Sequence, residues 1–148
     1  RDVAPSRGLG DVYKRQQYAF GHGDGKWRME RINQISFKDN VNASFLNFLQ
    51  KFFAANGAGM IRNPLPYSGP DPNGEETSHV ETTIPAEEWS TFLPTVPDNM
   101  IYNILYGQKY GKSQRKILVF RGLSNGIETR LVFKQRHGKW RLEKVKAY

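Results

Sequence analysis

Cysteine is absent from the 148 residues of the chain, which excludes disulfide bonds and thiolate metal sites within this stretch. Long hydrophobic runs are missing too, since no apolar stretch reaches the ~18 residues that a membrane-spanning helix needs. Histidine occurs only three times, and no zinc spacing, phosphate loop or nucleophile elbow is present. We therefore expect neither a metal nor a cofactor. A chain of this length can bury a sizeable core without covalent cross-links.

Positive charge is missing from the middle of the sequence. Residues 63–107 hold seven acids and no Lys or Arg, whereas residues 108–148 hold twelve Lys or Arg and two acids. The net charge of +8 therefore hides an acidic middle and a basic C-terminal part. Such asymmetry can mark a surface for nucleic acid or for a membrane. It also arises when acidic loops lie over a basic sheet, and we favour this explanation because charged strand faces usually just meet water.

An octapeptide occurs twice in the chain. Residues 25–32 read GKWRMERI and residues 138–145 read GKWRLEKV, 113 positions later. In both copies the apolar residues first alternate and then skip two positions, which predicts a β-bulge near residues 143–144. The repeat predicts that residues 17–35 are the terminal hairpin of a truncated upstream domain and that residues 43–148 form one complete domain.

Two alternative arrangements are expected for the first copy of the octapeptide. Residues 26–32 either pair along the edge of the complete domain's sheet or remain a poorly anchored arm. Trp27 and Trp140 both follow a hairpin turn, in register with an apolar neighbour. We expect both to be core residues rather than ligand-stacking ones.

Apolar periodicity predicts the main helix of the complete domain. Phe45, Phe48, Leu49 and Phe52 recur at helical spacing, which predicts a well-buried helix over residues 43–56. A loop-rich stretch follows, and then Pro85 is expected to open a short helix with Trp89 on its apolar face. Strands are predicted at the remaining apolar segments, which are residues 79–84, 100–106, 116–121, 127–135 and 139–145.

The first sixteen residues show no hydrophobic period, so we expect residues 1–16 to be disordered or foreign to the protein. Residues 11–16, DVYKRQ, resemble the in-frame translation of the transposase mosaic end used to build sequencing libraries. That resemblance implies a remnant that interrupted the gene. The alternative is a chance hexapeptide in a natural linker.

The order of these segments resembles nuclear-transport-factor-2-like (cystatin-like) domains. Residues 45–53, the IRNPL segment at 61–65 and residues 131–145 with their Gly-Lys-Trp-Arg-Leu ending carry the likeness. It implies an α+β fold in which a long N-terminal helix packs on a curved, cone-like antiparallel sheet. The chain is also similar to a bacterial family of unknown function whose members look like secreted lipoproteins, some with tandem domains. That likeness implies the cell envelope or periplasm, with peripheral attachment through a lipid anchor lost from this chain.

Catalytic candidates are few. Enzymes of the resembled fold place an Asp or His inside the cone as a general base. Asp98 lies in a turn-forming stretch, and His79 lies in a polar stretch with scattered acids. We therefore expect a non-catalytic binding or interaction module, and keep a small enzyme with Asp98 or His79 as base as the alternative.

Two groups of residues are candidates for binding. Trp89, Tyr102 and Tyr106 are expected to line the mouth of the cone, because small-ligand pockets prefer aromatic walls. The basic strands supply an anion-binding alternative, with Arg121, Arg130, Lys134 and Arg141 as its named residues. No recognised nucleic-acid motif accompanies this charge, so we expect a small molecule or an envelope protein as partner rather than nucleic acid.

Overall fold

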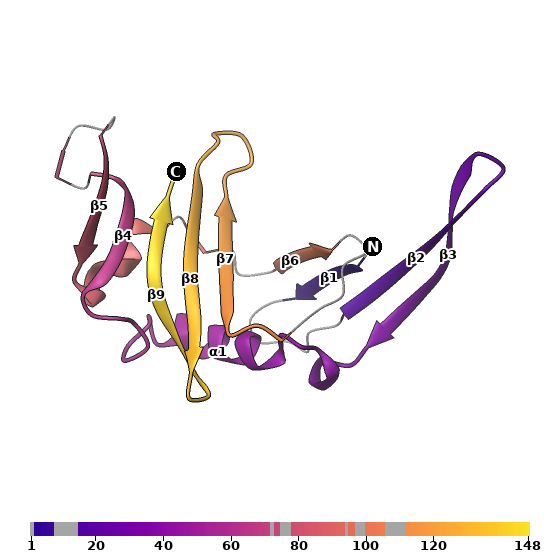
Figure 1. Ribbon diagram of the computed structural model, residues 1–148, viewed down its shortest axis with the longest axis horizontal. Helices are drawn as coiled ribbons and strands as arrows, with labels where there is room; N and C mark the ends of the chain where they lie inside the picture. Colours follow the sequence, from indigo (N-terminus) through magenta and orange to yellow (C-terminus); the bar gives the residue numbers. More distant parts are fainter. Residues whose placement is uncertain are drawn as a thin grey trace. The chain divides into compact units, whose positions relative to one another are not determined.

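The strands of the chain form two separate sheets (Figure 1). The computed structural model describes residues 2–7, 15–71, 73–74, 78–93, 95–96, 100–105 and 112–148. The chain divides into two compact units. Unit 1 comprises Arg1–Gln50 and Pro97–Lys112, and unit 2 comprises Lys51–Val96 and Ser113–Tyr148. Each unit contains one sheet.

Unit 1 holds a four-stranded antiparallel sheet with the order β3-β2-β1-β6. Its strands are β1 (Asp2–Arg7), β2 (Arg15–Gly23), β3 (Lys26–Ile35) and β6 (Met100–Leu105). We expected residues 1–16 to lack regular structure, but residues 2–7 form a strand because they pair with both β2 and β6. β3 pairs with β2, so residues 26–32 do not pair with the sheet of unit 2.

Unit 2 holds a five-stranded mixed sheet with the order β5-β4-β9-β8-β7. Its strands are β4 (Leu65–Pro70), β5 (His79–Ile84), β7 (Arg115–Arg121), β8 (Glu128–Arg136) and β9 (Lys139–Ala147). The expected sheet was antiparallel, but β4 runs parallel to β9, so the sheet is mixed. The extended piece at residues 60–62 also pairs with β9, through Ile61 and Leu142.

The helix α1 (Ala43–Ala54) lies within the predicted residues 43–56 and is preceded by the short 3-10 helix η1 (Phe37–Asp39). Phe45, Leu49 and Phe52 lie on one side of α1 and are buried, as the helical spacing predicted. The helix ends at Ala54, and Gly57 follows it with a positive φ of 74° and a bond from its N–H to the Phe52 carbonyl (2.7 Å), which are typical of a C-terminal cap.

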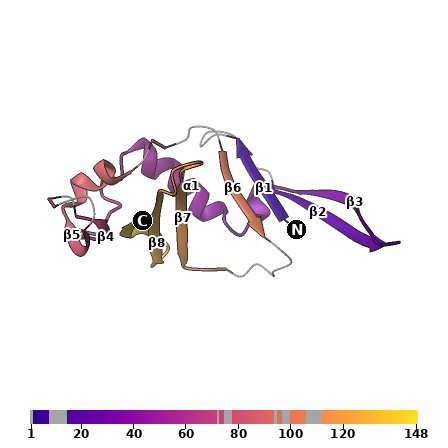
Figure 2. The ribbon, with the colours of Figure 1, turned by 90° about the horizontal axis from the view of Figure 1, so that it is seen from above.

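Aromatic packing forms the core of unit 2. The last turn of α1 places the Phe52 ring 4.7 Å from the Trp89 ring and 5.3 Å from the Phe133 ring, centre to centre. Trp89 belongs to the short 3-10 helix η2 (Ala86–Phe92) and donates its indole N–H to the Asn56 carbonyl at 2.9 Å. Figure 2 shows η2 on the same side of the sheet as the end of α1.

The predicted bulge is present in the β8–β9 hairpin. Val132 pairs with Lys144 while Phe133 pairs with Leu142, so Glu143 is the extra residue of β9. The inserted residue lets both Leu142 and Val145 face the core, where each is fully buried. Trp140 is 8% exposed, which confirms its predicted place in the core.

We predict that Phe52→Ala lowers the free energy of unfolding by about 3–5 kcal/mol, because it removes a fully buried ring between two other aromatic rings. Urea denaturation followed by circular dichroism measures the change. Leu123→Ala is the matched control, since Leu123 is fully exposed and its truncation should cost less than about 0.5 kcal/mol. A loss below 1 kcal/mol for Phe52→Ala would show that this packing does not hold unit 2 together.

Candidate functional site

One face of the unit 2 sheet is the core and the other is open. Along β7, Lys116, Leu118 and Phe120 alternate with more exposed neighbours. Phe120 faces the core, since its ring lies 6.5 Å from the Phe53 ring of α1. The residues between them face away from the core, because successive strand residues point to opposite faces. These outward residues of β7 are Arg115, Ile117, Val119 and Arg121.

The register of the strands places like charges opposite each other on this open face. Lys134 of β8 pairs with Arg115 of β7 on one side and with Arg141 of β9 on the other. Next to this row, Arg136 pairs with Lys139 at the end of the hairpin. Directly opposed like charges destabilise a sheet, so this arrangement has a cost that binding an anion would remove. We call Arg115, Lys134, Arg136, Lys139 and Arg141 the basic cluster.

Within the described part of the chain, one acid contacts the basic cluster. The Glu143 carboxylate accepts from Arg141 Nη2 at 2.7 Å, and Arg62 Nη1 lies 3.6 Å from its other oxygen. Glu143 is the bulge residue and its side chain is 6% exposed. The remaining four cations have no ion pair with any described residue.

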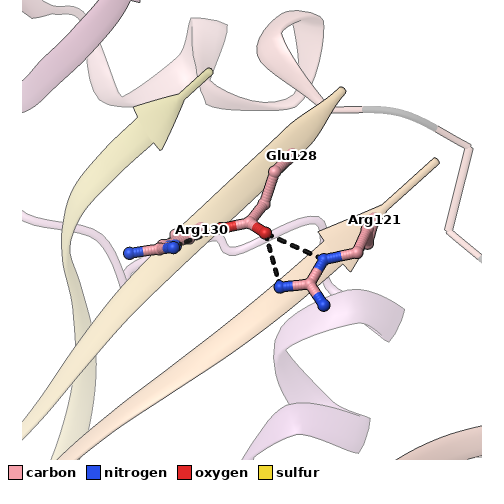
Figure 3. A network of polar contacts seen from close by, with 3 residues as sticks. All are labelled: Arg121, Glu128 and Arg130. Carbon is pink, nitrogen blue, oxygen red and sulfur yellow. Dashed lines mark hydrogen bonds and ion pairs between the residues drawn. The ribbon is translucent and has the colours of Figure 1, made fainter. Parts of the chain in front are cut away.

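Arg121 and Arg130 lie around a second glutamate, Glu128 (Figure 3). Arg121 donates from Nε and Nη2 to one carboxylate oxygen at 2.9 Å and 2.6 Å, and Arg130 Nε donates to the other oxygen. The Arg130 guanidinium also lies 4.9 Å from the centre of the Tyr148 ring. Hydrogen bonds from Arg121 and then Arg130 hold the pKa of Glu128 below its usual range. The single negative charge of Glu128 therefore offsets one of the two positive charges of this pair of arginines.

The four predicted anion-binding residues thus fall into two pairs. Lys134 and Arg141 lie side by side in the basic cluster, whereas Arg121 and Arg130 share Glu128. The sequence could not distinguish the two pairs, because one depends on the register between β8 and β9 and the other on the register between β7 and β8. Arg115 was not among the four named residues, and its place opposite Lys134 depends on the register between β7 and β8.

The aromatic candidates do not form a described pocket. Trp89 is 1% exposed and belongs to the core, against Phe52 and Phe53. Tyr102 lies in β6, of which the structure describes the backbone, and Tyr106 falls outside the described residues. Of these three side chains, the structure therefore describes only that of Trp89.

The structure describes one of the two catalytic candidates. Asp98 lies outside the described residues. His79 is exposed on β5, the edge strand, with Nε2 3.2 Å from the Ser68 hydroxyl. Ser68 donates its proton to Glu81 at 2.6 Å, so His79 Nε2 can meet this hydroxyl only as a donor. A general base needs the opposite polarity, so this contact does not activate Ser68.

Glu81 ties this group to the open face of the sheet. Its carboxylate accepts from Lys144 Nζ at 2.8 Å as well as from Ser68. The hydrogen bond from Lys144, followed by that from Ser68, lowers the pKa of Glu81. The pair joins β5 to β9 across β4, so its role is structural.

Lys116 is the one lysine on the core face of β7, opposite Phe133. Burial lowers the pKa of its ammonium group. In the sequence, only the alternation of Lys116 with Ile117 along the predicted strand indicates that Lys116 faces the core. Among the described residues, no group of three metal-type ligands occurs and no helix is long and apolar enough to cross a bilayer.

Comparison with known families identifies the chain. Residues 11–147 match the family described as Domain of unknown function (DUF4348). The chain belongs to this family. An NTF2-like protein from Bacteroides fragilis NCTC 9343, solved by crystallography, is 29% identical over 99% of the chain, with a TM-score of 0.73. The chain spans 64% of the length of that protein. No curated protein matches the chain.

The resemblance to nuclear-transport-factor-2-like domains is therefore confirmed at the level of the fold. The chain has an NTF2-like α+β fold with a mixed sheet, and the family carries no assigned function.

We predict that Glu128→Gln lowers the melting temperature at pH 7 and that its difference from the wild type disappears in acid. Glu128 has a lower pKa in the folded state, so its stabilising effect is present above the usual glutamate pKa and is lost as pH falls through the folded value. Calorimetry between pH 7 and about pH 2 measures this difference. Glu87→Gln, at an exposed site on η2, is the control. An equal deficit at both ends of the range would contradict the ion-pair account.

Proposed function

We propose that unit 2 is a non-catalytic binding module that holds an acidic protein partner on the open face of its sheet. The observation that carries this proposal is the row Arg115–Lys134–Arg141, in which like charges face each other across three strands. A site that gains an anion there relieves repulsion that the free protein bears. Electrostatic complementarity of this kind mainly speeds association and selects partners of opposite charge.

The apolar part of the same face favours a protein over nucleic acid. Ile117 and Val119 are 47% and 42% exposed, and they lie across from Val132 and Arg130. Protein interfaces commonly combine an apolar centre with a polar and Arg-containing rim. A phosphate backbone would use the cations and leave this apolar strip unused.

We also propose that the protein works outside the cytoplasm, in the cell envelope or periplasm. Support comes from the likeness to secreted bacterial lipoproteins, which also suggests a lipid anchor on a longer form of the protein. Fractionation of the product of the intact gene, with metabolic palmitate labelling, tests this part. Recovery in the cytoplasmic fraction without label would contradict it.

We predict that Lys134→Glu weakens binding of poly-L-glutamate roughly tenfold at low salt, because it reverses the central charge of the row. Fluorescence anisotropy with labelled polymer measures the affinity, and raising the salt should weaken wild-type binding steeply. Lys51→Glu is the matched control, since it makes the same charge change at an exposed position of α1 and should keep wild-type affinity.

Three results would overturn the proposal. They are no salt-sensitive association of the wild type, equal losses for Lys134→Glu and Lys51→Glu, or tighter binding to duplex DNA of matched charge than to poly-L-glutamate.

A further inference from the structure

The β2–β3 hairpin of unit 1 repeats the geometry of the β8–β9 hairpin of unit 2. Both turns have two residues at positive φ: 52° and 71° at Asp24 and Gly25, and 50° and 76° at His137 and Gly138. Each hairpin also carries a bulge, and the two bulges lie 113 positions apart in the sequence. In the first, Ala19 pairs with Arg31 and Phe20 with Met29, so Glu30 is the extra residue, as Glu143 is in the second.

The two hairpins differ in what covers their apolar faces. In β8–β9, the apolar side chains Phe133, Trp140, Leu142 and Val145 are 0% to 8% exposed. At the matching positions of β2–β3, the side chains Phe20, Trp27, Met29 and Ile32 are 44% to 71% exposed. The prediction that Trp27 is a core residue is therefore wrong within this chain. A contiguous face of this kind on a protein surface usually marks an interaction site.

The segment that covers β8–β9 shows what such a hairpin accepts. Phe52 of α1 packs against Phe133 on the apolar face. After α1, residues 60–62 run alongside β9, where Arg62 N–H donates to the Leu142 carbonyl and Leu142 N–H donates to the Met60 carbonyl, each at 2.9 Å. The parallel strand β4 then continues this pairing along β9. One helix–loop–strand segment thus covers both the face and the edge.

The β2–β3 hairpin lacks both of these partners in the described structure. β3 is the outermost strand of its sheet, whereas β9 has neighbours on both sides (Figure 1). In unit 2, Arg62 of the covering segment forms an ion pair with Glu143. Among the described contacts, Glu30 has no ion pair with a corresponding arginine. An open edge beside an exposed apolar face is a combination that native proteins avoid leaving uncovered.

We propose that β2–β3 is the terminal hairpin of a preceding NTF2-like domain of the same polypeptide. Its occupant is a helix–loop–strand segment of that domain. The helix places aromatic side chains on Phe20 and Met29, and the strand runs parallel to β3 along its free edge. The greater length of the Bacteroides fragilis protein, of which this chain spans 64%, is consistent with such an additional domain.

Cysteine labelling tests the occupant directly, because the chain has no cysteine of its own. Met29→Cys is introduced into the 148-residue chain and into the longer product of the intact gene, and the rate of reaction with a thiol reagent is measured in both. Leu123→Cys, in an exposed loop of unit 2, is the control and should react equally fast in both. We expect Met29→Cys to react at least roughly tenfold more slowly in the longer protein.

The outcomes distinguish the possible occupants. Equal rates at position 29 in the two proteins, or an intact gene that encodes no preceding domain, would overturn the proposal. Protection that rises with concentration in the 148-residue chain would also overturn it, because a second copy would then cover the face. Ile32→Cys provides a second reporter on the same face should Met29→Cys disturb folding.

Discussion

The structure of unit 2 depends on covering one face of a bulged hairpin with aromatic rings. Phe52 lies against both Trp89 and Phe133, so one helix residue links η2 to the sheet. The bulge at Glu143 makes this possible, since without the extra residue Leu142 and Val145 would point to opposite faces. The same register determines which residues lie on the opposite face of the sheet, because the strand neighbours of each inward-pointing residue point outward.

The open face follows from that register and not from composition. The +8 charge of the chain could be spread evenly, yet β7, β8 and β9 align Arg115, Lys134 and Arg141 in one row. Nearby, Glu128 offsets one of the two positive charges of Arg121 and Arg130, so a count of basic residues alone overstates the basic surface. What distinguishes the proposed binding face is therefore the opposition of like charges beside exposed Ile117 and Val119, and this supports the proposal of an acidic partner with apolar contacts.

Local features of the fold could be predicted from the sequence, and long-range pairings could not. Helical spacing located α1, and the broken alternation located the bulge at Glu143, because both signals lie within a few residues. The pairing of β6 with β1 and the parallel pairing of β4 with β9 join segments far apart in the chain, and no local period encodes them. Trp89 was expected near a ligand, but a large ring beside Phe52 gains more from burial in the core.

From the repeated hairpin we propose that the apolar face and free edge of β2–β3 are covered as those of β8–β9 are. Hydrogen exchange of the β3 amides that point to its outer edge tests this most directly, measured in the 148-residue chain and in the longer gene product. The account predicts rapid exchange of these amides in the shorter chain and, in the longer protein, slow exchange comparable with that of the Leu142 amide. Rapid exchange in both proteins would contradict the claim that a parallel strand of the same polypeptide occupies that edge.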